Sequence, residues 1–302
     1  MVVSVEELAV DAAVDVAAYR DAARAARLLG RARADGSLDE RWDALANSLP
    51  DLAVAPDGTL AEWLDPAVPE NIAHRHVSQL YPLWYDADEK FAADSPSSAA
   101  LREAARRTID AKIAWRAHDT APPPGRMEMA FGLGQLGQAA AALGDAEAAV
   151  RCVEWLALLH WRPSLTTTHD ADSIFNLDAS GALPAVVASM LTRSTMDSLH
   201  LLPALPARWP CGEVTGLCAR GGIVIDRLAW DEASATVELR RLPAASWLCP
   251  AGTTIMHTGS GFTWRDEQGD ADGSARVVEL RDEAVTLRLR RPPRRGSTAT
   301  TS

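Results

Sequence analysis

The feature that most constrains the fold is a change of hydrophobic period near residue 195. Before it, apolar residues recur at three- and four-residue steps, as in Leu101, Ala105, Ile109 and Ile113. This spacing places apolar side chains along one face of a helix. After it, short β-branched or alternating runs are separated by Gly and Asp clusters, which is typical of antiparallel strands. The chain of 302 residues is therefore predicted to be α+β, with helices first and a small β domain last.

Turn and capping residues divide the first part into helices. Gly144 and Asp145 predict a tight connection between two antiparallel helices, with Asp145 as the N-cap. Helix pairs joined by short loops favour an α-hairpin array or toroid. The helices are predicted at 8–30 (closed by Gly30), after the capping box 37–40, at 97–117, 127–143 and 146–160, and from Asp178 or Ser180 to 192.

The second part reads as strands followed by an unpatterned end. We predict a helical domain over 1–195, an antiparallel β domain over 196–290 and a disordered tail over 291–302. The strands are predicted at 217–226, 236–242, 253–257, 275–280 and 285–289.

Charge and composition exclude several classes of function. The chain has 41 acidic and 30 basic residues, a net charge of −11, which argues against nucleic acid as a partner. No apolar run approaches the roughly 20 residues needed to cross a membrane. Four cysteines are too few for a disulfide scaffold. Only Lys90 and Lys112 are lysines, which indicates GC-rich coding and says little about function. The first residues lack the features of a secretory signal, and the compartment stays unassigned.

Three segments between predicted helices concentrate polar, acidic and ring-bearing residues: 58–65, 74–81 and 169–181. Such connections line one mouth of a helical toroid, where active-site groups concentrate. Sugar chemistry needs carboxylates as acid and base, and sugars stack on aromatic faces. The candidates are the carboxylates Glu62, Asp65, Asp172 and Asp178, the aromatic platforms Trp63, Trp84 and Trp161, and His74 or His76 as a partner of a sugar hydroxyl.

Each candidate also has a structural interpretation. Asp178 is equally suited to capping the helix that follows it. His74 and His76 could form a metal pair, but no third ligand has convincing spacing. Arg75 could hold a buried carboxylate in a forked pair, and the tryptophans could be core. The glycines of 132–137 lie in a helical pattern and not after a strand, so they do not form a dinucleotide site. We expect no metal and no cofactor.

Four segments together resemble the glycoside hydrolase family 95 α-L-fucosidases. They are Glu62-Trp63, His74-Arg75-His76-Val77-Ser78, the stretch 175–181 from Phe to Gly, and the long Leu-Leu-Pro-Ala-Leu-Pro stretch that opens 201–222. The similarity runs from about residue 5 to residue 290.

The resemblance implies the later half of an (α/α)6 barrel followed by an antiparallel β-sandwich domain. It implies inverting hydrolysis of terminal α-L-fucosides, or of the related α-L-galactosides, in glycans. Asp178 matches the family's Asp that activates an Asn base. The His-Arg-His segment matches an active-site loop whose histidine contacts the sugar, with His74 and His76 left as alternatives. The implied substrate-binding set is Glu62, Trp63, His74, Arg75 and His76.

The departures from the family pattern concern the reaction itself. The family's general acid Glu and its Asn base lie upstream of every segment in this chain and have no match here. The usual Gly-Trp-Ser stretch is replaced by 125–131, in which Glu128 is an additional carboxylate. We therefore expect a fragment or truncated form of the hydrolase. The alternatives are a non-catalytic remnant that binds carbohydrate or a partner, and assembly with a separate chain that carries the N-terminal half.

Overall fold

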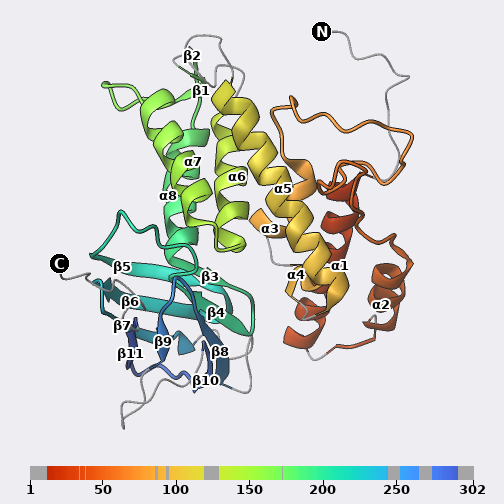
Figure 1. Ribbon diagram of the computed structural model, residues 1–302. Coiled ribbons are helices and arrows are strands. Elements are labelled where there is room, and N and C mark those ends of the chain that lie inside the picture. The colour runs from red at the N-terminus through yellow and green to blue at the C-terminus, as the bar shows by residue number, and fades with distance from the viewer. Residues whose placement is uncertain are drawn as a thin grey trace, which may run out of the picture. The chain divides into compact units, whose positions relative to one another are not determined.

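The computed structural model describes residues 12–33, 35–37, 39–85, 88–92, 95–118, 129–171, 173–243, 252–264 and 274–291 (Figure 1). It divides into two compact units, Met1–Met190 and Leu191–Ser302. Helices predominate in the first unit and strands predominate in the second, which confirms the α+β class. The predicted limits at 195 and 290 stay predictions, and residues 292–302 lie outside the described part.

The predicted helices of the first unit are present, with shifted ends. Gly30 does not close the first helix, because Arg33 N–H still donates to Leu29 O at 3.1 Å. The elements are α1 (Ala13–Ala32), α2 (Asp39–Ser48), the 3-10 turn η2 (Ser78–Leu80), α3 (Tyr81–Trp84), α4 (Glu89–Ala92), α5 (Pro96–His118), α6 (Ala130–Ala142), α7 (Ala146–Leu159) and α8 (Asp178–Leu191).

The connection between α6 and α7 follows the predicted chemistry. The Asp145 carboxylate accepts the Ala148 N–H at 3.0 Å and so caps α7. Gly144 has φ of 74°, a conformation that suits glycine. This short turn brings the two helices back against each other in the antiparallel pair expected from the sequence.

The glycines of α6 let α8 approach closely. A Cβ built at Gly134 would lie 2.6 Å from the Ala182 Cβ, and one built at Gly137 would lie 2.8 Å from both Val186 methyl groups. Both glycines are buried inside a helix, as the sequence analysis expected. Their spacing therefore serves helix packing and not the binding of a dinucleotide phosphate.

We predict that Gly137→Ala destabilises the helical unit by about 1–2 kcal/mol, because the overpacking cost exceeds the gain in helix propensity. The added methyl group would also meet the Cys152 Cβ at 3.0 Å. Gly181→Ala in α8 is the matched control, since nothing lies within 4 Å of its Cβ position. Urea unfolding should show a lower midpoint for the first variant only; equal midpoints would contradict this packing.

A short hairpin that the sequence analysis treated as loop lies before α8. Strands β1 (Thr168–Asp170) and β2 (Ser173–Phe175) pair antiparallel, with Thr168 opposite Phe175. Strands of three residues are too short to give a readable alternation. The hairpin fixes the segment that leads into Asp178.

The described residues of the second unit form two sheets. One has the order β5-β6-β7-β11-β9 and the other β10-β8-β4-β3. Most pairs are antiparallel as predicted, but β4 and β8 are parallel. The strands are β3 (Thr192–Ser194), β4 (Ser198–Leu201), β5 (Gly212–Ala219), β6 (Ile223–Trp230), β7 (Ser234–Arg241), β8 (Thr253–Thr258), β9 (Thr263–Trp264), β10 (Ala275–Glu279) and β11 (Val285–Arg290).

The single strand predicted over 217–226 is wrong. The chain reverses there, so that Ala219 of β5 pairs with Ile223 of β6. Gly221 and Gly222, with φ of 72° and 71°, make the reversal because side chains rarely adopt these angles. The apolar run continues across the turn, so the spacing of apolar residues in the sequence does not reveal the boundary between β5 and β6.

Each sheet of the second unit has a buried face. Along β7, Val237, Leu239 and Arg241 alternate with more exposed residues. The buried Arg241 guanidinium donates to Thr254 Oγ1 of β8 at 2.6 Å and to the Gly221 carbonyl at 2.7 Å. It thus joins the two sheets across the core of the unit.

Among the described helices, none combines the length and apolar character that crossing a lipid bilayer requires.

Candidate functional site

Glu62 is a buried carboxylate at the centre of the first group of candidate residues. It is only 5% exposed, and its Oε1 accepts the Ser78 hydroxyl at 2.5 Å and lies 3.9 Å from His74 Nδ1. Its backbone is fixed as well, because its carbonyl accepts the Ala13 N–H at 2.9 Å and its N–H donates to Glu70 Oε1 at 3.0 Å. The carboxylate is therefore held in one place between two loop segments.

Glu70 is a second carboxylate here that the sequence analysis did not select. Burial raises the pKa of its carboxyl, the N–H of Glu62 opposes this rise, and the negative charge of Glu62 adds to it. The two glutamates are thus coupled through the backbone and through their charges.

The rings of His74, His76 and Phe131 pack edge to face. The His74 and His76 centroids lie 4.8 Å apart, and those of His76 and Phe131 lie 5.9 Å apart. Burial, followed by the charges of His74 and Arg75, lowers the pKa of His76 below its usual 6.5. A neutral imidazole has one donor and one acceptor nitrogen, which suits a sugar hydroxyl.

Lys112 of α5 binds the backbone carbonyls of this loop, and the sequence analysis did not select it. The side chain is fully buried, and its Nζ donates to the His74 carbonyl at 2.6 Å and to the His76 carbonyl at 3.0 Å. The Asn71 carbonyl is a third acceptor at 3.4 Å. A lysine in a helical pattern reads as a solvent-exposed residue, so only the tertiary contact reveals its role.

Arg116, one turn further along α5, is also buried. Its Nη1 donates to the Lys112 carbonyl at 3.0 Å and its Nη2 to the Arg75 carbonyl at 3.5 Å. The side chain of Arg75 itself is exposed. In the described part of the chain no carboxylate pairs with it, so the forked-pair alternative for Arg75 finds no support.

Asp178 belongs to a second polar group, at the start of α8. Its Oδ2 lies 3.9 Å from His169 Nδ1, while the other ring nitrogen of His169 lies 3.8 Å from Asp170 Oδ1. The Asn176 side chain accepts the Asp178 N–H. An acidic residue in the first turn also stabilises the helix, so the structural and the chemical interpretations of Asp178 are compatible.

The segment before Asp178 is fixed by Thr167. Its hydroxyl donates to the Asn176 carbonyl at 2.5 Å and lies 3.0 Å from the Ser180 hydroxyl. The fully buried His160 ring contacts the Thr168 carbonyl through Nδ1 at 3.2 Å. Hydrogen bonds of the hairpin and of the start of α8 therefore fix the position of the backbone at Asp178.

The beginning of α6 connects the two polar groups. Phe131 packs on His76 of the first group, and Met129 pairs with Asp170 beside the second. The β1–β2 hairpin accordingly lies by this part of α6 (Figure 1). The sequence candidates Glu62, His74, His76 and Asp178 thus flank one helix end. Asp172 and Glu128 lie outside the described residues.

The remaining candidates make contacts of their own, and two of them, Trp63 and Trp161, adjoin the two polar groups. The exposed Asp65 accepts the Ala67 N–H at 2.9 Å within its own turn. Trp63 is half-buried and pairs with Ala12 through the backbone. Trp84 packs edge-on against Tyr81, with ring centroids 5.0 Å apart. Trp161 pairs with Thr167 in an isolated bridge.

Across the described residues, no three His, Cys, Asp or Glu side chains gather in a way that could hold a metal ion. The suggested metal pair of His74 and His76 thus gains no third ligand there.

Comparison with known proteins identifies both units. The model of the glycosyl hydrolase family 95 catalytic domain matches residues 4–191. The chain belongs to glycoside hydrolase family 95. The model of the family 95 C-terminal domain follows it and matches residues 193–255. The resemblance drawn from the loop motifs is therefore confirmed at the level of the family.

A curated relative of this family 95 chain is Alpha-L-fucosidase 2 of Arabidopsis thaliana. The two are 30% identical over 233 residues, which cover 74% of this chain and 25% of the relative. The chain thus spans about a quarter of the length of the curated relative that it matches.

Proposed function

We propose that this family 95 chain forms part of a glycosidase site that takes terminal α-L-fucosyl, or α-L-galactosyl, residues of glycans. The observation that carries the proposal is the meeting of two polar groups at the start of α6, one around Glu62 and one around Asp178. The name of the Arabidopsis relative, Alpha-L-fucosidase 2, supports fucose as the sugar.

The proposed roles follow the chemistry of each group. The neutral His76 ring binds a sugar hydroxyl, and Phe131, which is 42% exposed, offers an apolar edge beside it. His74 bridges from the Glu62 carboxylate toward His76. Asp178, with its side chain 37% exposed, is accessible to a partner group and takes the role of the family's activating Asp.

This chain binds the sugar, whereas hydrolysis needs a larger assembly that also supplies the acid and the base. An activating Asp needs an Asn base to polarise and a proton donor for the leaving oxygen. Each missing acid or base costs typically 10²–10⁴-fold in rate. We therefore expect hydrolysis only with a polypeptide, continuous or separate, that carries the family's upstream Glu and Asn motifs. A remnant that binds carbohydrate without hydrolysis is the alternative outcome.

The test measures fucose binding and hydrolysis separately. Saturation-transfer NMR should detect binding of fucose to the chain. The His76→Ala variant should bind fucose with about tenfold lower affinity. Together with a polypeptide that carries the family's upstream Glu and Asn motifs, the chain should release 4-nitrophenol from the aryl α-L-fucoside. In that assembly, Asp178→Asn should lower kcat by about 10²-fold or more.

Asp39→Asn is the matched control, since Asp39 is also an acidic residue in the first turn of a helix. It should alter neither readout. Equal fucose affinity in His76→Ala and Asp39→Asn, or full hydrolysis by Asp178→Asn, would contradict the assigned roles.

A further inference from the structure

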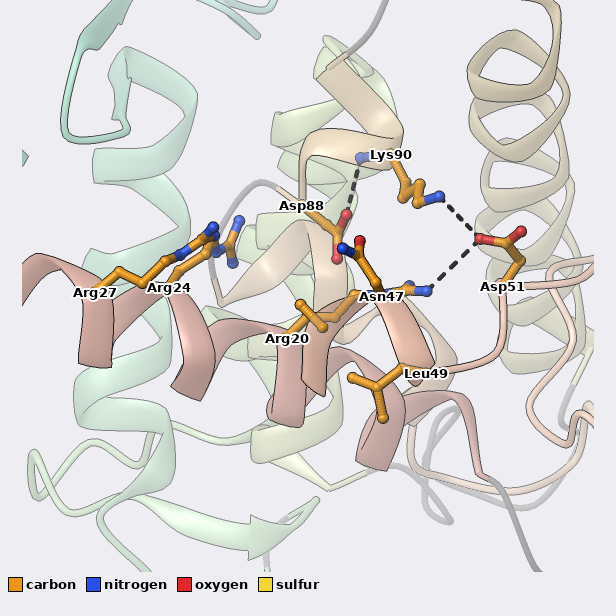
Figure 2. Close-up of a pocket in the computed structure, with 9 residues that line it drawn as sticks. Arg20, Arg24, Arg27, Asn47, Leu49, Asp51, Asp88 and Lys90 are labelled. Atoms are coloured by element: carbon orange, nitrogen blue, oxygen red, sulfur yellow. Dashed lines mark hydrogen bonds and ion pairs between the residues drawn. The ribbon is translucent and has the colours of Figure 1, made fainter. Parts of the chain in front are cut away.

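A polar pocket of about 250 Å³ lies on a face of α1, within the helical unit. None of the residues around it belongs to the sugar site proposed above (Figure 2). It is lined by Arg20, Arg24, Arg27, Ala46, Asn47, Leu49, Asp51, Asp88 and Lys90.

The lining is rich in positive charge although the chain carries −11. Arg20, Arg24 and Arg27 follow one another at steps of four and three, so they extend from the same face of α1. Figure 2 shows Arg24 and Arg27 reaching in the same direction. Lys90 adds a fourth cation, and Asp51 and Asp88 are the acidic members among the described residues of the lining.

Both lining carboxylates already have internal partners. Asp51 accepts from Lys90 Nζ at 2.9 Å, and this hydrogen bond is the main reason that its pKa is lowered. Asp88 is buried and accepts the backbone N–H of Lys90 at 2.8 Å, which caps α4. Both carboxylates therefore already accept hydrogen bonds from the pocket wall.

Arg24 and Arg27 each pair with a carboxylate. Arg24 pairs with Asp21 at 2.8 Å, and both of these side chains are largely buried, whereas Arg27 pairs at the surface with Asp43, whose side chain is half exposed. Surface pairs of the latter kind contribute little to stability and exchange readily. A guanidinium carries five N–H donors, so the one carboxylate beside Arg27 leaves donors of this arginine available for a second anion.

Arg20 supplies the observation that points to a ligand. It is only 8% exposed, and its Nη2 donates to the Pro50 carbonyl at 2.6 Å and lies 3.7 Å from Asp51 Oδ1. Its Nη1 is buried, and no group in the described residues accepts from it. A buried charged donor without an acceptor is costly, and an oxygen bound in the pocket would remove that cost. The exposed Asn47 side chain also lies in the pocket wall, beside Arg20 in Figure 2.

We propose that this pocket binds a phosphate group, either as inorganic phosphate or as the monoester of a small molecule. Arginine forks match the tetrahedral oxygens of phosphate with paired N–H donors. The pocket is smaller than the roughly 300–1,000 Å³ of sites for drug-sized ligands, so it accepts a phosphate with at most a small attached group.

The test titrates inorganic phosphate into the purified chain at constant ionic strength, with calorimetry as the readout. Saturable binding to a single site is expected. Arg20→Met should weaken it by about tenfold or more, and Arg27→Gln by several-fold. Arg27 is at the surface, so the second variant keeps the test valid if the first does not fold.

Arg107→Gln is the matched control, because Arg107 is an exposed helical arginine that pairs with Glu103 four residues away. It should bind phosphate as the unaltered chain does. Tighter binding of methyl phosphate would identify a monoester as the ligand, and equal affinities would identify free phosphate. Absence of saturable binding, or equal affinities in Arg20→Met, Arg27→Gln and Arg107→Gln, would overturn the proposal.

Discussion

Lys112→Met is expected to destabilise the helical unit by about 2–4 kcal/mol. The substitution keeps the length of the side chain but removes the ammonium group that binds the carbonyls of Asn71, His74 and His76. Each buried acceptor left without a donor costs about 1–3 kcal/mol, and partial access of water to the loop reduces the sum. Urea unfolding measures the loss, and hydrogen exchange of the amides at 71–77 should become faster.

Lys90→Met is the control that the chain itself offers, since Lys90 is its other lysine. Lys90 is 45% exposed and pairs with Asp51 at the surface, so its loss should cost less than about 1 kcal/mol. Because the His76 carbonyl is one of the released acceptors, Lys112→Met should also weaken fucose binding. Equal unfolding midpoints for the two lysine variants would show that Lys112 does not support the loop.

The β unit is expected to lose stability as the pH falls, through His200. This residue of β4 lies between Arg193 on β3 and His257 on β8, and the two imidazole rings stack 4.4 Å apart at 14°. Burial first, then the charges of His257 and Arg193, lower the pKa of His200 from 6.5 to about 4. The folded unit therefore excludes a proton that the unfolded chain binds.

The sign of the effect follows from this difference in proton binding. The contribution of the neutral His200 to the stability of the folded unit is fully present above the pKa of the unfolded chain, near 6.5. It is lost as the pH falls toward the folded pKa of about 4. A shift from 6.5 to about 4 corresponds to about 3 kcal/mol. Burial lowers the pKa of His257 as well, so its contribution has the same sign.

Two measurements check the prediction. An NMR titration should place the transition of His200 near pH 4, and urea unfolding at pH 7 and pH 4.5 should give a smaller difference for His200→Gln than for the unaltered chain. The comparison between the two proteins cancels the other groups that titrate in this range. A His200 transition near pH 6.5, or equal differences, would contradict the effect of burial.

The helical elements could be predicted from the sequence where local chemistry sets them. Asp145 caps α7 and Gly144 takes the left-handed turn, because both act on their own backbone. The period of apolar residues likewise predicted α5 and the change to strands near residue 195. Long-range pairing carries no such local signal, which is why the parallel contact of β4 with β8 was not foreseen.

The candidate site was foreseen in its residue types but not in its support. Glu62, His74, His76 and Asp178 follow from loop motifs, and the structure brings them to the two sides of the start of α6. Glu70 and Arg116 contribute through contacts with backbone groups of other residues, Glu62 and Arg75, so their own side-chain types do not identify them.

By itself, the sequence determined the α+β class, the order of the helical and β parts and the family, and it predicted candidate residues for sugar binding. These depend on periods and motifs that lie within short stretches of chain. Only the tertiary structure decided which of those residues adjoin one another, that Lys112 is a buried anchor and that one buried nitrogen of Arg20 finds no acceptor among the described residues. The physical reason is that burial and hydrogen bonding depend on neighbours tens of residues away, which the folded chain alone brings together.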